Sequence, residues 1–185
     1  MGAGSPEPTD LRRRRGRLVL AIAVVAVLLV AGGLAAWRAT TPSAFPAYGN
    51  AWGYDGTIPV GQGYAVAMVD GVGGRAVTLE GARARVSDAS ASVAVDVLLC
   101  VPTEGREAGV GSVGLDELAP FCDRLLPVDG QDLAELPEQT SIVATFTPLA
   151  NGPVVIRGID LTYREGVRTV TQHTGTRVEY HPPRR

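Results

Sequence analysis

The sequence predicts an all-β domain that follows one N-terminal transmembrane helix. The first observation is an uncharged run of twenty residues, 18–37, directly after a cluster of arginines. The second is a series of short runs with alternating apolar residues and frequent glycine, which begins near residue 64. The third is a single pair of cysteines, Cys100 and Cys122. We therefore expect a disordered basic tail over 1–17, a transmembrane helix over 18–37, a linker over 38–63 and a β-sandwich over 64–181.

The uncharged run LVLAIAVVAVLLVAGGLAAW, residues 18–37, has the length that a transmembrane helix needs. At about 1.5 Å per residue it matches the thickness of a bilayer's hydrocarbon core, about 30 Å. Five arginines precede it, and basic residues stay on the cytoplasmic side of a membrane. The small polar residues at the start of the tail predict disorder. The sequence therefore predicts a single-pass plasma-membrane protein with a cytoplasmic N-terminus and an extracytoplasmic C-terminal domain.

A cleaved signal peptide is the alternative to a retained signal-anchor. A signal peptidase could cut near Ala35 or Ala36, after the basic region and the apolar stretch. The apolar stretch is longer than the roughly 7–15 residues that are usual in signal peptides. Trp37 and Arg38 also form a stop at the membrane interface. These features favour the anchor, and both alternatives place the domain outside the cytoplasm.

The β domain is predicted from the period-two spacing of its apolar residues. This spacing changes phase at Gly81, which predicts a β-bulge. Leu98 and Cys100 are apolar on the second face of the run 93–101, so we expect both faces of that strand's end to be covered. Seven or eight short strands at this spacing predict a β-sandwich of immunoglobulin-like type. The apolar residues alternate along the runs 64–68, 77–79, 82–86, 93–101, 142–146, 155–163, 167–172 and 178–180.

Residues 115–126, LDELAPFCDRLL, interrupt the β pattern. Leu115, Leu118 and Cys122 have helical spacing, which predicts a short helix or irregular turns in a long connection between strands. An even number of cysteines in an oxidising compartment favours a disulfide between Cys100 and Cys122 over two buried free thiols. In the chain-entropy model, closing a loop of this length contributes roughly 3 kcal/mol of stability.

The charges of the outer domain argue against a nucleic-acid partner. Residues 42–185 hold eleven arginines and seventeen acids, a net charge of −6, whereas nucleic-acid binding needs a basic face. Nine of those acids lie in residues 104–138, together with Arg106 and Arg124. This segment is predicted to be a solvated acidic insertion, with a cation site or a site for a basic partner as the alternative.

No pattern in the sequence predicts a catalytic centre, a cofactor or a metal site. GVGSVG at 109–114 matches GxGxxG, but it does not follow its strand directly and no βαβ unit surrounds it, so it predicts a flexible loop. His173 and His181 are predicted to be solvated residues at strand ends, because no third ligand is spaced to join them. No serine lies in a GxSxG or SxxK pattern. We therefore expect a protein that is not an enzyme and binds no cofactor.

The stretch GPVVIRGIDLTYREGVRTVTQHTG, residues 152–175, resembles the C-terminal strands of uncharacterised actinobacterial single-pass membrane proteins. Those proteins pair an arginine-flanked N-terminal anchor with a small extracytoplasmic β-domain and a cysteine pair. The resemblance extends over residues 93–180. It implies the location and the fold of the chain, and it implies no activity, cofactor or partner.

The sequence is compatible with three functions. The first is a non-enzymatic cell-envelope protein whose β-sandwich contacts another protein or a wall polymer, since function on such folds lies in loops and exposed faces. The second is an accessory or sensing subunit of a membrane complex, whose helix would pack through the small residues at 31–36. The third is a cell-wall-active enzyme with an unrecognised site.

The topology can be tested with reporters fused after residue 185. The five arginines before residue 18 should hold the N-terminus in the cytoplasm. Alkaline phosphatase fused after residue 185 should therefore be active. A fluorescent protein that matures only in the cytoplasm should stay dark at the same position. The reverse pattern would place the C-terminal domain in the cytoplasm and contradict the predicted orientation.

Overall fold

The structure, a computed structural model, describes residues 8–40, 44–46, 51–55, 58–103, 105 and 110–181. The chain divides into two units, Met1–Thr41 and Pro42–Arg185. The second unit contains all the strands, whereas the first contains one helix.

The helix of the first unit, α1 (Pro8–Thr40), begins earlier than the sequence predicts. Residues 8–17 are helical, so the prediction of disorder is wrong for them, and residues 1–7 lie outside the described part. Proline suits the first helical position and arginine is a good helix former, which together explain the early start. Within the described part of the chain, no helical segment combines the length and the apolar character that a membrane crossing requires. The membrane helix over 18–37 stays a prediction.

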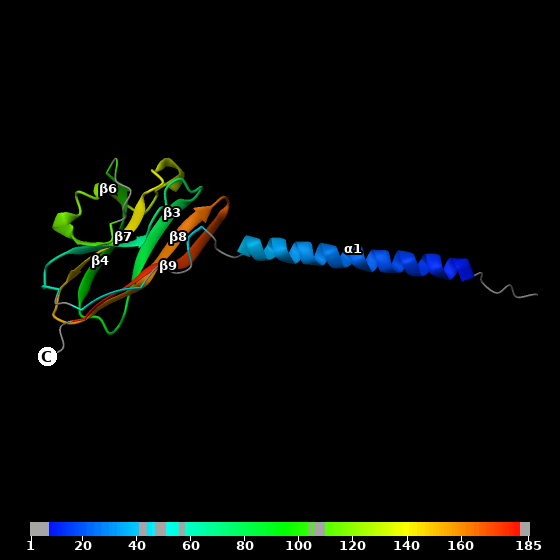
Figure 1. The fold of residues 1–185 in the computed structure, drawn as a ribbon, viewed down its shortest axis with the longest axis horizontal. Helices are drawn as coiled ribbons and strands as arrows, with labels where there is room; N and C mark the ends of the chain where they lie inside the picture. The colour runs from blue at the N-terminus through cyan, green and yellow to red at the C-terminus, as the bar shows by residue number, and fades with distance from the viewer. Residues whose placement is uncertain are drawn as a thin grey trace, which may run out of the picture. The chain divides into compact units, whose positions relative to one another are not determined.

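The second unit consists of two β-sheets that face each other across a core (Figure 1). A four-stranded sheet has the order β1-β9-β8-β3, and a five-stranded sheet has the order β5-β2-β7-β4-β6. Neighbouring strands are antiparallel, except that β1 and β9 are parallel. The all-β prediction is confirmed. The strands are β1 (Ala51–Asp55), β2 (Tyr64–Val69), β3 (Thr78–Val86), β4 (Val93–Pro102), β5 (Ser112–Gly114), β6 (Cys122–Pro127), β7 (Ser141–Pro148), β8 (Val154–Glu165) and β9 (Arg168–His181).

Most of the core between the sheets is formed by the alternating residues that the sequence pattern selects, but Leu133 and Ile156 are in the core without having been selected, and the selected Val155 lies outside it. Both inner faces contribute fully buried side chains, and removing them from water is the main favourable contribution to folding. Tyr64, Phe146 and Tyr180 bring aromatic rings from both sheets together, with centroids 5.4–6.1 Å apart. The largest fully buried side chains are Leu79, Leu99, Leu133, Ile142, Phe146, Ile156, Ile159, Leu161 and Tyr163.

Two local predictions for the strands are confirmed. The pairing of β3 with β8 shifts register between Leu79 and Gly81, as the bulge prediction requires. The end of β4 is covered on both faces, since Leu99, Cys100 and Val101 are all buried. The reason is that Leu99 faces the other sheet, whereas Cys100 belongs to a second apolar cluster.

The linker predicted over 38–63 is wrong at three places. α1 continues to Thr40, and β1 pairs with β9. Phe45 inserts into the core with its ring edge-on to Tyr163, 5.1 Å between centroids. Its carbonyl accepts a hydrogen bond of 2.7 Å from Gln172 Nε2, and Gln172 Oε1 accepts one of 2.9 Å from the Tyr163 hydroxyl. A single inserted side chain leaves no periodic pattern, so the sequence did not indicate this contact.

The insertion between β4 and β7 supplies both edge strands of the five-stranded sheet. β5 pairs with β2 at one edge, and β6 pairs with the end of β4 at the other. The flexible loop predicted over 109–114 is therefore wrong at 112–114, and residue 109 lies outside the described part. The short helix or irregular turns predicted over 115–126 are confirmed over 115–121, as the 3-10 turn η1 (Leu115–Glu117) and the turns after it, and are wrong from Cys122, where β6 begins. β6 is largely exposed, which explains why it lacks a regular alternation of apolar residues.

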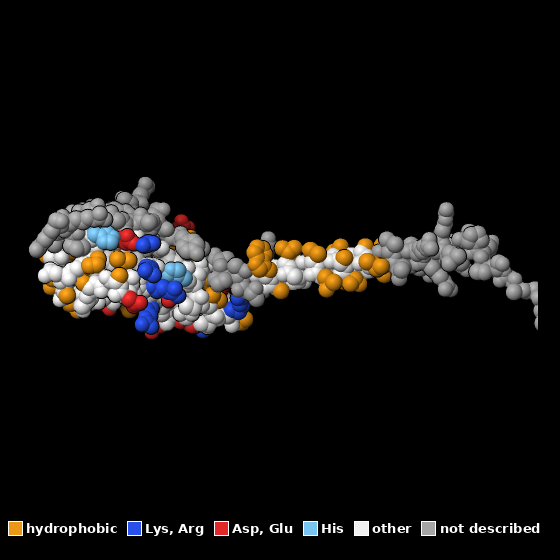
Figure 2. Space-filling view, turned by 90° about the horizontal axis from the view of Figure 1, so that it is seen from below, with side chains coloured by type: hydrophobic (Ala, Val, Ile, Leu, Met, Phe, Trp, Pro, Cys, Tyr) orange, Lys and Arg blue, Asp and Glu red, His pale blue; other side chains and the backbone are white. Residues whose placement is uncertain are grey.

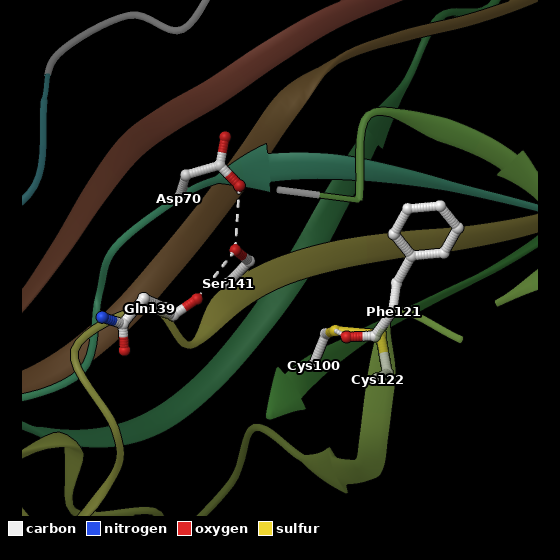
Figure 3. Close-up of a disulfide and its surroundings, with 6 residues drawn as sticks. All are labelled: Asp70, Cys100, Phe121, Cys122, Gln139 and Ser141. Atoms are coloured by element: carbon white, nitrogen blue, oxygen red, sulfur yellow. Dashed lines mark hydrogen bonds between the residues drawn. A yellow bond between two sulfur atoms is a disulfide. The ribbon is translucent and has the colours of Figure 1, made fainter. Parts of the chain in front are cut away.

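A disulfide joins Cys100 of β4 to Cys122 of β6, as the sequence predicts (Figure 3). It lies in a small apolar cluster distinct from the main core. Ala65 and Ala67 of β2 contribute small side chains to this cluster, and their size leaves room for Val110 and Leu118 of the insertion. Beside the disulfide, Ser141 Oγ donates a hydrogen bond of 2.8 Å to Asp70 Oδ1. The disulfide thus holds the insertion against the sheet that it extends.

Loss of the disulfide should destabilise the domain without changing the arrangement of its strands. In the double variant Cys100→Ala/Cys122→Ala, the crosslink is lost and no thiol is left, so the free energy of unfolding should fall by roughly 3 kcal/mol. Urea unfolding of the full chain in neutral detergent, with and without reductant, measures this. Mass spectrometry of the unreduced, alkylated protein is the direct check. Two alkylated thiols together with an unchanged midpoint on reduction would contradict the prediction.

Candidate functional site

The two sheets leave an open cleft of about 1100 Å³ between β3 and the first half of β4. β3 is the last strand of its sheet, and β6 covers only residues 98–102 of β4. The floor of the cleft is apolar and half-buried. It consists of Ala82, Ala84, Val93, Val95 and Val97, which pack against the main core.

Arginines gather along the β3 side of this cleft, on the outer face of the four-stranded sheet. Figure 2 views this face, where arginine (blue), histidine (pale blue) and acidic side chains (red) lie together. Arg83 and Arg85 belong to β3 and Arg157 to β8, and all three line the cleft. Arg157 lies directly opposite Arg177 of β9 in the sheet register. We call Arg83, Arg85, Arg157 and Arg177 the arginine cluster.

A bulge at Gly158 places Arg157 and Asp160 on the same face of β8. The register with β9 shifts between Arg157 and Ile159, so these residues share the outer face although three positions separate them. Gly158 has φ +90°, and a Cβ at this position would lie 2.6 Å from the Thr174 carbonyl oxygen. Only glycine fits both the conformation and the space. The geometry of the charged site therefore depends on this residue.

Asp160 is the centre of a charged network. Its Oδ2 accepts a hydrogen bond of 2.7 Å from Arg85 Nε, and its Oδ1 lies 3.1 Å from His173 Nδ1. Partial burial raises the pKa of Asp160, but the hydrogen bonds from Arg85 and His173 outweigh it, so the net pKa is lowered. The carboxylate is therefore ionised at neutral pH, and it orients both neighbours.

The cationic charge of the cluster is only partly neutralised. Glu179 pairs with Arg177 and His181, and the hydrogen bond from Arg177 is the main cause of its lowered pKa. Among the described residues, neither Arg83 nor Arg157 takes part in an ion pair. Like charges directly opposite on neighbouring strands destabilise a sheet. Glu179 offsets the charge of Arg177, so Arg157 is the member of this pair that has no acidic partner among the described residues, and it lines the cleft.

Guanidinium groups in such an arrangement can bind carboxylate or phosphate groups, often through two hydrogen bonds at once. The Asp160–His173 pair resembles the acid and base of a hydrolase, but among the described residues no hydroxyl or thiol is hydrogen-bonded to His173. In the same part of the chain, no group of three His, Cys, Asp or Glu side chains could hold a metal ion. The chemistry that the site offers is anion binding beside an apolar floor.

The residues singled out in the sequence lie in different places. Cys100 and Cys122 come together, but neither lines the cleft. The prediction that His173 lies at a strand end is wrong. It lies within β9, where it is half-buried against Asp160. His181 does end β9 and is exposed. Sequence reasoning missed the arginine cluster, because its members are spread from residue 83 to residue 177.

Comparison of this chain with protein-family models, curated proteins and solved structures finds no match. The likeness of residues 152–175 to actinobacterial membrane proteins therefore stays a prediction. What the cleft binds has to be judged from its own residues.

The network around Asp160 should make stability depend on pH. Asp160→Asn removes the charge that holds Arg85 and His173, and we expect a loss of about 1 kcal/mol at pH 7, since the partners are partly exposed. Because the native pKa of Asp160 lies below its unfolded value of about 3.9, this contribution is present above that pH. It is lost as the pH falls through the lower native pKa.

Urea unfolding of both proteins between pH 7 and pH 2.5 measures the effect. The difference in unfolding free energy should shrink below about pH 4. Asp123→Asn, at an exposed aspartate of β6, is the control and should change stability by less than about 0.5 kcal/mol at pH 7. A constant difference between Asp160→Asn and the unchanged protein over the whole range would contradict the prediction.

Proposed function

We propose that this protein is a non-enzymatic, membrane-anchored envelope protein whose β-sandwich binds an anionic partner at the arginine cluster. The observation that carries the proposal is the cross-strand pair of Arg157 and Arg177 beside the open cleft, with Arg83 and Arg157 outside the ion pairs of the described residues. A sheet does not gain stability from such a pair. Glu179 already pairs with Arg177, and a bound carboxylate or phosphate would neutralise Arg157 and gain charge-assisted hydrogen bonds.

The distribution of charge supports a local anion site on an acidic domain. Residues 104–138 carry nine acids and two arginines, and strands β5 and β6 of this insertion extend the five-stranded sheet. The arginine cluster lies on the four-stranded sheet. Of the acids of the insertion, Asp123 lies in β6, whereas Asp132 and its neighbours pack against the start of β3. A partner that bears negative groups is attracted to one face and repelled by the acidic insertion, which favours one orientation of binding.

The order of the strands supports an immunoglobulin-like sandwich. In that fold, strands B, E and D are neighbours in one sheet, and C, F and G are neighbours in the other. The orders β2-β7-β4 and β3-β8-β9 match these neighbours when the strands are counted along the chain and the insertion strands β5 and β6 are left out. With this correspondence, the binding face is the outer face of the C-F-G sheet.

The location in the envelope rests on the arginines before residue 18 and on the uncharged run 18–37. The disulfide is consistent with an oxidising compartment outside the cytoplasm. On this proposal, the helix retains the sandwich at the membrane, where an anionic group of a wall polymer or of another envelope protein meets the arginine cluster.

Binding to two simple polyanions tests the proposed function. The full chain in neutral detergent should bind both poly-L-glutamate and long-chain polyphosphate, measured by thermophoresis at low salt, and binding should weaken as salt rises. Arg157→Glu should weaken binding of each polyanion at least about tenfold, because it replaces an attraction by a repulsion.

Arg124→Glu is the matched control, since it makes the same change of charge within the acidic insertion. It should change the affinity less than about twofold. Absence of binding by both polyanions, or an equal loss in the two variants, would contradict an anion site at the arginine cluster.

A further inference from the structure

We propose that the partner is an extended polypeptide with alternating acidic and apolar residues, which binds as an added β-strand along the free edge of β3. The inference rests on the proposed function and identifies the chemical class of its partner. It is carried by three features of the cleft: the unpaired strand edges, the alternation of its lining and the signs of the charges on its two sides.

The backbone edges at the cleft are available for pairing. Among the described residues, the backbone of 80–86 pairs with β8 alone, and that of 93–97 pairs with β7 alone. The earlier part of the β3 edge is already occupied, because Leu79 exchanges hydrogen bonds with Gly130 and Gln131. An exposed strand edge offers N–H and C=O groups to an extended chain. The register with β8 is regular over Gly81–Ala84, so the added strand would be short.

The lining of the cleft selects the side chains of such a strand. Along β3, Ala82 and Ala84 form part of the apolar floor, whereas Arg83 and Arg85 face outward. Side chains of an added strand alternate in the same way, because neighbouring strands share their faces. One set of its residues would therefore lie over Val93 and Val95 and should be apolar. The other set would lie beside the arginines and should be acidic.

Charge favours the β3 edge for the added strand and disfavours a second copy as the occupant. The β4 side of the cleft carries Asp96, and Asp88 lies in the turn between β3 and β4. An acidic strand is repelled there and attracted by Arg83 and Arg85 on the β3 side. Pairing of β3 with β3 of a second copy would bring these arginines together, and like charges opposite each other oppose such a pair. At the β3 edge, the acidic residues of such a strand would meet Arg83 and Arg157, which lie outside the ion pairs of the described residues.

The test uses the full chain in neutral detergent and the blocked heptapeptide Glu-Val-Glu-Val-Glu-Val-Glu as the probe. We expect it to bind at least about tenfold more tightly than Glu-Ser-Glu-Ser-Glu-Ser-Glu, which has the same charge but no apolar face. A version with N-methylated valines, which cannot donate from those amides, should lose at least about tenfold in affinity. Hydrogen exchange should slow at residues 80–86 when the first peptide binds.

Two variants locate the binding edge. Arg83→Glu should weaken binding of the Glu-Val peptide at least about tenfold, since it reverses a charge beside the added strand. Arg124→Glu, the same change on β6, should leave it within about twofold. A melting curve like that of the unchanged protein shows that each variant is folded. Hydrogen exchange of the unchanged protein with bound peptide locates the binding edge without any variant.

The outcomes separate this inference from the proposed function. If all three peptides bind equally and poly-L-glutamate also binds, strand addition is wrong and the anion site stands. If no peptide and no polyanion binds, both are wrong. Concentration-dependent self-association, measured by analytical ultracentrifugation without peptide and accompanied by slower hydrogen exchange at residues 80–86, would identify a second copy as the occupant and overturn the inference.

Discussion

The pairing of β8 with β9, including its bulge at Gly158, is the constraint on which the arrangement of the charged face depends. This is the longest antiparallel pair in the domain, and it lies in the middle of the four-stranded sheet. Without the bulge, Arg157 and Asp160 would point to opposite faces, because side chains alternate along a strand. With it, Asp160 reaches both Arg85 and His173, and Arg157 remains beside Arg177. One glycine thereby determines which charges meet.

The insertion between β4 and β7 extends the five-stranded sheet, but it leaves the first half of β4 without a second neighbour. It supplies strands to both edges of the five-stranded sheet, and the disulfide fastens it to β4. Its later part also covers the first residues of β3 through Gly130 and Gln131. Among the described residues, the edges 80–86 and 93–97 have no second partner strand, and the cleft lies between them. Exposed edges are usually blocked, and here Arg83 and Arg85 repel a second copy while they leave the edge open to an acidic chain.

The chain contains no lysine, so every cation at the cleft is a guanidinium or a histidine. A guanidinium is planar, keeps its charge at any pH at which the protein is folded and offers a fork of donors to a carboxylate or a phosphate. The apolar floor beside the cluster adds a surface that a simple inorganic anion would not use. Positive charge at the rim and apolar surface below it suit a partner that carries both acidic and apolar groups.

The sequence by itself determined the features that depend on neighbours along the chain. Alternation of apolar residues predicted β2, β3, β4, β7, β8 and β9, the change of phase at Gly81 predicted the bulge, and the single cysteine pair predicted the disulfide. Only the tertiary structure decided that Phe45 enters the core, that Cys122 starts a strand and that the arginine cluster exists. The reason is physical. Periodicity reports which face of a segment is buried, whereas register and strand order depend on packing between segments far apart in the chain.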